Sequence, residues 1–119
     1  LIQIGKWMDH FPTLHLWVRT PLIPGATARP DNLLGIGAFL VQNLTGKVMR
    51  WELCAFNNLC RDKYRRLGME WEYQYTPLLT AEELATLTEA ARASGFPSEL
   101  IIPSGATRVE VLDPEGEVL

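Results

Sequence analysis

The residues that could perform catalysis are few, and they do not form a known catalytic motif. The histidines are His10 and His15, and the cysteines, Cys54 and Cys60, are six positions apart. No serine lies in a G-x-S-x-G sequence, the sharp turn that exposes a nucleophilic serine. The sequence also lacks the C-x-x-C and H-x-x-x-H spacings of common zinc sites. We therefore predict no catalytic residue, no bound metal and no cofactor.

Paired carboxylates are the remaining candidates for acid–base chemistry. Glu70 and Glu72 alternate with apolar residues, so on a strand both would project from one face and could act together. A solvated sheet face is the commoner explanation of such a pair. Glu82 and Glu83 follow Thr80 in the pattern of a helix capping box, which already accounts for them. Neither pair is predicted to be catalytic.

Basic residues cluster in the first part of the chain and suggest binding. Residues 1–67 carry a net charge of +5 and residues 68–119 one of −8, which together make the formal −3. Either the two parts face each other and partly neutralise, or the basic part meets an acidic partner. Ten residues from the basic run and from a Pro-rich loop form the predicted binding surface: Lys47, Arg50, Arg61, Lys63, Arg65, Arg66, Pro24, Arg29, Asp31 and Asn32.

This combination favours a non-catalytic protein-binding module, such as an adaptor, an assembly factor or an accessory subunit, rather than an enzyme. The basic helix face and the Pro-rich loop would contact a protein partner, through its acidic surface or by self-association. Trp, Tyr and Arg, which are enriched in interface hot spots, are all present. One alternative is a domain that binds single-stranded RNA or DNA through the same basic segment and its strand aromatics, although a pI near 5.3 argues against it. The second alternative is a small enzyme or ligand carrier.

The elements that must position these residues follow from hydrophobic periodicity and turn residues. Period-two alternation predicts strands, apolar residues three and four apart predict helices, and Gly and Pro mark their ends. We expect a strand at 14–20, a loop at 21–32, a hairpin at 35–53 that turns at 44–46, a helix at 55–67, a strand at 69–75, a capped helix from Thr80 to about Ala93, an extended piece at 99–102 and a strand at about 107–112.

These elements predict an α+β fold for residues 1–119. It is a single compact domain with a mostly antiparallel sheet of about four to five strands and two helices packed on it. The expected core contains Leu14, Leu16, Val18, Val41, Leu59, Tyr64, Trp71, Tyr73, Leu84, Leu87 and Val109.

The cellular setting is inferred from absences in the sequence. No stretch approaches the ~20 apolar residues of a membrane helix, so we expect no membrane contact. Two cysteines are too few for a disulfide framework, which favours a reducing compartment. We therefore expect a cytoplasmic protein, processed or trimmed from a longer one because it begins with Leu1.

Overall fold

A computed structural model describes residues 2–10, 15–58 and 61–109 of the chain. Helices and strands alternate along it, and the order of elements is α1 (Ile2–Met8), β1 (Leu16–Leu22), α2 (Pro30–Leu44), β2 (Val48–Ala55), α3 (Arg61–Arg66), α4 (Ala81–Ala93), a short 3-10 helix (Ser98–Leu100) and β3 (Ile101–Ser104). Within the described residues, no helix is both long and apolar enough to span a bilayer.

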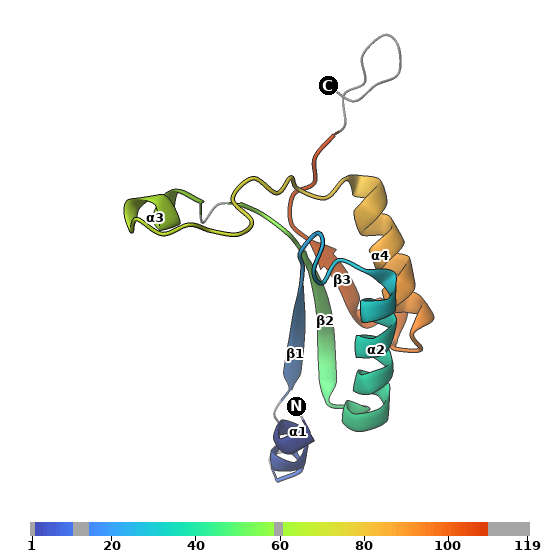
Figure 1. The fold of residues 1–119 in the computed structure, drawn as a ribbon. Coiled ribbons are helices and arrows are strands. Elements are labelled where there is room, and N and C mark those ends of the chain that lie inside the picture. Colours follow the sequence, from blue (N-terminus) through green and yellow to red (C-terminus); the bar gives the residue numbers. More distant parts are fainter. Residues whose placement is uncertain (1, 11–14, 59–60, 110–119) are drawn as a thin grey trace.

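The three strands form one parallel sheet in the order β1-β2-β3. Because parallel neighbours need a crossover, α2 connects β1 to β2, and α4 lies in the connection from β2 to β3. Each crossover connects a strand to the next one in the order β1-β2-β3. When two such crossovers have the same handedness, their helices lie on the same face of the sheet. Figure 1 shows α2 and α4 side by side along the sheet, where they contact each other.

The predicted antiparallel α+β fold is therefore wrong. Its main error is the hairpin at 35–53, because the first expected arm lies within α2. Pro30 at the helix start and Asp31 in the first turn are favourable there. The buried residues Leu33, Gly37, Leu40 and Leu44 follow helical spacing. Gly35 and Gly37, which lie in the expected first arm, are both helical.

Of the two other alternating segments expected to be strands, the one at 69–75 is not a strand. Residues 72–75 form a turn and residues 69–71 are irregular, although their aromatic residues alternate. At 107–112 the described part contains a single parallel bridge between Arg108 and Thr80, and residues 110–112 lie outside the described ranges. The capped helix is confirmed, because Thr80 and Glu83 form both hydrogen bonds of a capping box.

Strand β1 runs through Pro21, where we had expected it to end. Pro21 is tolerated because β1 is an edge strand. A proline there, which has no N–H, removes no hydrogen bond between two inner strands. The expected loop at 21–32 therefore shortens to the connection 23–29.

The core lies between the sheet and the two helices. Its largest fully buried side chains are Trp51, Leu22, Leu33, Leu40, Leu44 and Leu53. Of the expected core, Leu87 is buried, and Leu16, Val18 and Leu84 pack against the core as partly buried residues. Tyr64, Trp71 and Tyr73 are half-buried in a separate cluster, whereas Val41 is exposed and Val109 is 87% exposed. Leu14 and Leu59 lie outside the described residues.

Gly37 is where α2, α4 and the sheet come closest. A Cβ atom built on it would lie 1.9 Å from Ser94 Oγ, 2.3 Å from Ser94 Cβ and 3.2 Å from Trp51 Cζ3. Gly35, two positions earlier in α2, has nothing within 4 Å of such an atom. The two glycines therefore have different roles, and only Gly37 is required by packing.

Replacing each glycine by alanine tests this contact. Gly37→Ala should lower the free energy of unfolding by about 1–3 kcal/mol, because the added methyl forces α2 away from Ser94 and Trp51. Gly35→Ala is the matched control and should raise it by roughly 0.5–1 kcal/mol, because alanine favours an exposed helical position. Urea unfolding of both variants measures the difference. Equal stabilisation by both substitutions would show that α2 does not approach α4 as described.

Candidate functional site

The sheet face opposite α2 and α4 is polar. Side chains alternate along β2, and since Trp51 and Leu53 are buried on the helix side, their neighbours project the other way. This uncovered face carries Arg50, Glu52 and Cys54 from β2, with Trp17 and Arg19 of β1 and Ser104 of β3 in register beside them.

Glu52 is the centre of a polar network on this face. Ser104 Oγ donates a hydrogen bond to Glu52 Oε1 at 2.8 Å. Arg19 Nη2 lies 3.5 Å from the same oxygen, and Arg50 Nη2 lies 3.6 Å from Oε2. The Glu52 side chain is 14% exposed, whereas that of Arg19 is 67% exposed. The carboxylate is thus held in place on three strands, while Arg19 remains open to solvent.

The network also affects protonation. The hydrogen bond from Ser104 is the largest cause that lowers the pKa of Glu52, and Arg19 and Arg50 lower it further against an opposing effect of burial. The pKa of Arg19 is raised, first by the neighbouring Cys54 and then by Glu52. Glu52 is therefore ionised and Arg19 cationic at neutral pH. Together, the side chains of Arg19, Arg50 and Glu52 carry a formal net charge of +1.

Arg50 connects this network to an exposed aromatic ring. Its guanidinium carbon lies 5.3 Å from the centre of the Trp17 ring, within the range of a cation–π contact. Arg50 Nε is shielded from solvent and has no hydrogen-bond partner among the described residues. Since buried polar groups are normally paired, this donor is a place where a bound polar group would be stabilised.

The connection 23–29, which follows β1, uses its polar groups internally. Ile23 N donates to Thr27 Oγ1 at 2.8 Å, and Thr27 Oγ1 donates to the Pro21 carbonyl at 2.5 Å. Asn32 Nδ2 donates to the Thr27 carbonyl at 3.0 Å. The loop is therefore a tightly bonded turn that leads into α2.

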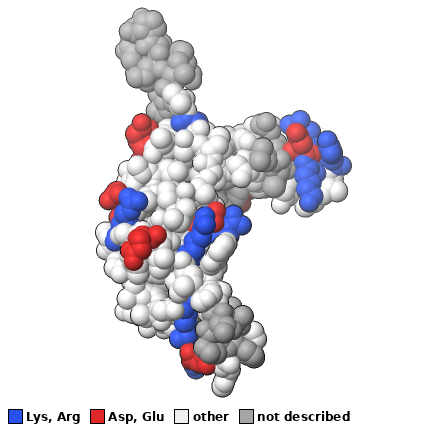
Figure 2. Space-filling view, turned by 180° about the vertical axis from the view of Figure 1, so that it is seen from behind, with Lys and Arg blue, Asp and Glu red and all other residues white. Residues whose placement is uncertain are grey.

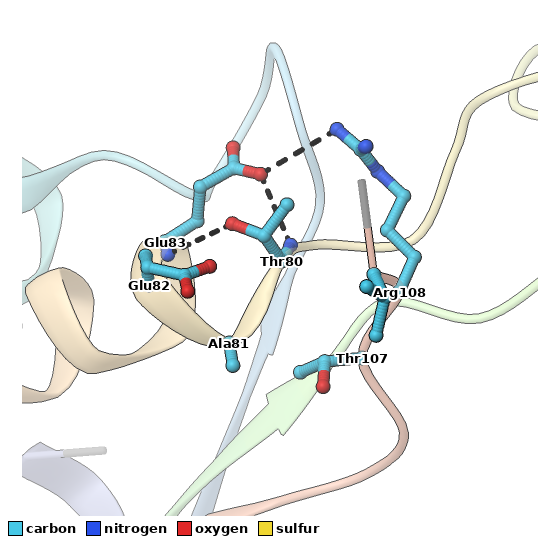
Figure 3. Close-up of a pocket in the computed structure, with 7 residues that line it drawn as sticks. Thr80, Ala81, Glu82, Glu83, Thr107 and Arg108 are labelled. Atoms are coloured by element: carbon cyan, nitrogen blue, oxygen red, sulfur yellow. Dashed lines mark hydrogen bonds and ion pairs between the residues drawn. The ribbon is translucent and has the colours of Figure 1, made fainter. Parts of the chain in front are cut away.

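Several polar groups that line the hollow at the start of α4 likewise bond to other groups of the chain. Figure 3 shows Arg108 directed toward the Glu83 carboxylate, from which it is 3.7 Å away, beside the capping box with Thr80. Arg108 Nε also donates to the Leu78 carbonyl at 2.6 Å. The amides of Thr80 and Glu83 are thus capped within the chain, and Arg108 is bonded across the hollow to the start of α4.

The ten predicted binding residues do not form one surface. Lys47 precedes β2 and pairs with Asp9 at 3.2 Å, whereas Arg50 lies on the uncovered face. Arg61, Lys63, Arg65 and Arg66 belong to α3. Pro24 lies in the turn after β1, Arg29 is the N-cap of α2, and Asp31 and Asn32 follow in its first turn. Among the ten, only Arg50 joins the Glu52 network, and binding by the others stays a prediction.

Arg19, Glu52 and Ser104 were missed as site residues. A signal did exist, because Arg50 and Glu52 alternate with the apolar residues of β2 and therefore share a face. Their meeting with Arg19 depends on the parallel register, which local sequence does not reveal. Within the described residues, no group of three His, Cys, Asp or Glu side chains is arranged to hold a metal ion.

Comparison with known proteins adds a distant relative. No family model matches the chain. The (2S)-3-sulfopropanediol sulfolyase activating enzyme of Bilophila wadsworthia (strain 3_1_6) is 31% identical over 74 residues, which cover 62% of this chain and 24% of the relative. The chain therefore spans about a quarter of the length of this relative.

This finding overturns the function expected from the sequence. The relative is named as an enzyme, so the prediction of a non-catalytic adaptor, assembly factor or accessory subunit is wrong. The error arose because the prediction relied on the absence of a short catalytic motif from the sequence.

The Glu52 network makes a prediction about protonation. Ser104→Ala should move the pKa of Glu52 upward toward its ordinary range, because it removes the largest cause of the lowering. A lowered pKa stabilises the fold above the pKa of the unfolded chain, and this stabilisation is lost as the pH falls through the folded value. Carbon-detected NMR titration of the glutamates measures the shift, with Ser98→Ala as a control at an exposed serine. An unchanged Glu52 titration in Ser104→Ala would show that this hydrogen bond is not formed.

Proposed function

We propose that this chain is part of an enzyme that activates another enzyme, and that the uncovered sheet face forms one wall of its active site. The observation that carries the proposal is the 31% identity to a protein named as a sulfolyase activating enzyme. The polar network on the sheet supports it, because charged groups that perturb one another's pKa values cluster at functional sites, and here a partly buried carboxylate contacts two arginines and a serine.

The position of the network fits this proposal. In parallel α/β sheets, ligands bind near the carboxyl ends of the strands, where the βα connections gather. Ser104 is the last residue of β3, and Cys54 precedes the last residue of β2. The connections 23–29 and 56–80 leave the sheet at this same end (Figure 1). Ser104 therefore lies at the end of the sheet that parallel folds use for binding, and Arg19 and Glu52 lie near the middle of their strands.

The charges indicate the kind of group that would bind. Arg19 is held at one side by Glu52, and its exposed guanidinium has further donors. Guanidinium groups bind carboxylates and phosphates through paired hydrogen bonds. We propose that Arg19 binds an anionic group of a small-molecule reactant, and that Glu52 orients both arginines.

The test measures activation of a second enzyme by the full-length protein. The target is (2S)-3-sulfopropanediol sulfolyase, with its named activating enzyme as positive control under identical conditions. The wild type should raise sulfolyase activity, and Arg19→Ala should reduce this effect about ten-fold or more, as expected for loss of a charge-assisted hydrogen bond.

Arg92→Ala is the matched control for Arg19→Ala. Arg92 is also an exposed arginine paired with a glutamate, Glu89 at 2.6 Å, but it lies on α4 and away from the uncovered face. Its substitution should leave activation unchanged. The proposal is overturned if the wild type produces no activation where the relative does, or if Arg19→Ala activates as well as Arg92→Ala.

A further inference from the structure

A projecting segment of the chain suggests how the activated enzyme is held. We infer that residues 61–76, here called the arm, are a docking surface for an acidic region on the protein that is activated. This inference rests on the proposed function, because it assigns a place to that function's protein substrate. The arm's position, its aromatic packing and the basic charge of α3 support it.

The arm belongs to the connection between β2 and α4 and projects away from the sheet and helices (Figure 1). Connections of this type usually contain about 2–6 residues, and much longer ones are commonly functional. The connection spans residues 56–80 and leaves from the carboxyl end of β2. A protein held on the arm would therefore lie beside the end of the sheet that carries the proposed site.

Aromatic packing gives the arm a defined shape. Tyr64 of α3 stacks on Trp71, with ring centres 5.6 Å apart and planes 12° apart. Phe56, at the end of β2, lies 6.0 Å from Trp71 and 6.1 Å from Tyr73. Because Phe56 is buried, this cluster fixes α3 to the strand. A surface ordered before binding loses less entropy when a partner docks.

The same packing argues against nucleic acid as the partner. A platform for single-stranded RNA or DNA needs aromatic faces that are free to stack on bases. Trp71 and Tyr73 instead contact each other and Phe56, while Trp51 is fully buried in the core. Three of the strand aromatics expected to form this platform are thus used in packing, whereas Trp17 and Tyr75 remain exposed.

The charge on α3 is mostly uncompensated. Its sequence is Arg-Asp-Lys-Tyr-Arg-Arg, and Asp62 pairs with Arg65 at 3.8 Å. Lys63 and Arg66 are exposed and form no ion pair within the described residues. Figure 2 shows Lys and Arg side chains gathered at the end of the arm. The acidic side chains of α4 that form ion pairs, Glu83 and Glu89, pair with Arg108 and Arg92 and not with α3.

Exposed apolar side chains follow this basic helix. Leu67 and Met69 are more than half exposed, and Tyr75 is 80% exposed. Aromatic residues, methionine and arginine are the types enriched in protein interfaces. A basic helix next to exposed apolar residues therefore fits an acidic protein surface with an apolar centre, and electrostatic complementarity would guide its approach.

The test measures binding and activation separately, with the full-length protein and (2S)-3-sulfopropanediol sulfolyase. The variant is Lys63→Glu with Arg66→Glu, and Arg92→Glu on α4 is the control. The double reversal should raise the Kd for the sulfolyase about ten-fold or more at low salt and reduce its salt dependence. It should raise the KM for sulfolyase in activation while kcat stays within about two-fold. Unchanged circular dichroism would show that the variant is folded.

The outcomes separate this inference from the proposed function. Binding that is lost on reversal, without activation by the wild type, supports the arm and overturns the proposed function. Activation with an unchanged Kd and KM in the double variant overturns the arm and leaves the proposed function intact. A fall in kcat alone, or no binding of sulfolyase by the wild type, also overturns the arm. Mixed-sequence single-stranded RNA is the competing probe, and its binding at physiological salt, lost on reversal, would assign the arm to nucleic acid instead.

Discussion

The indole of Trp51 is the contact on which the arrangement of layers depends. It lies fully buried in the central strand, and its Nε1 donates to Thr20 Oγ1 at 3.0 Å, which satisfies its one polar atom. Phe96 meets its ring edge-on at 5.4 Å, and Gly37 lets α2 approach from the other side. Trp51 thus contacts both α2 and Phe96 in the segment that follows α4, and the two helices contact each other.

Because both helices lie on one face of the sheet, the other face carries the polar side chains of the candidate site. Because alternate residues of a strand point to opposite faces, burial of Trp51 and Leu53 under the helices necessarily turns Arg50 and Glu52 away from them. Parallel register then brings Arg19 and Ser104 to the same carboxylate. The core and the candidate site are therefore two sides of one strand, and a shift of β2 by one residue would destroy both.

Sequence reasoning succeeded where local rules are sufficient. The helix at Thr80 follows from its capping box, and alternation indicated β1 and most of β2. It failed at α2, because a short apolar run with two glycines fits a strand as well as a buried helix. It also failed at 69–75, where alternating aromatic residues pack on Phe56 and Tyr64 without any partner strand. The Glu52 network could not be found from single strands, since its members meet only through parallel pairing.

The uncovered face has a consequence for how the sheet behaves in water. Parallel sheets are normally covered on both faces, because apolar strands left open tend to adhere to one another. Here Trp17 is exposed, yet Arg50 lies over its ring and Glu52 and Arg19 stand beside it. Stacking two such faces would require stripping water from these charges, which costs several kcal/mol per ion. The side chains that form the candidate site therefore also keep the face hydrated. A ligand that neutralised their charges would make association of two such faces more favourable.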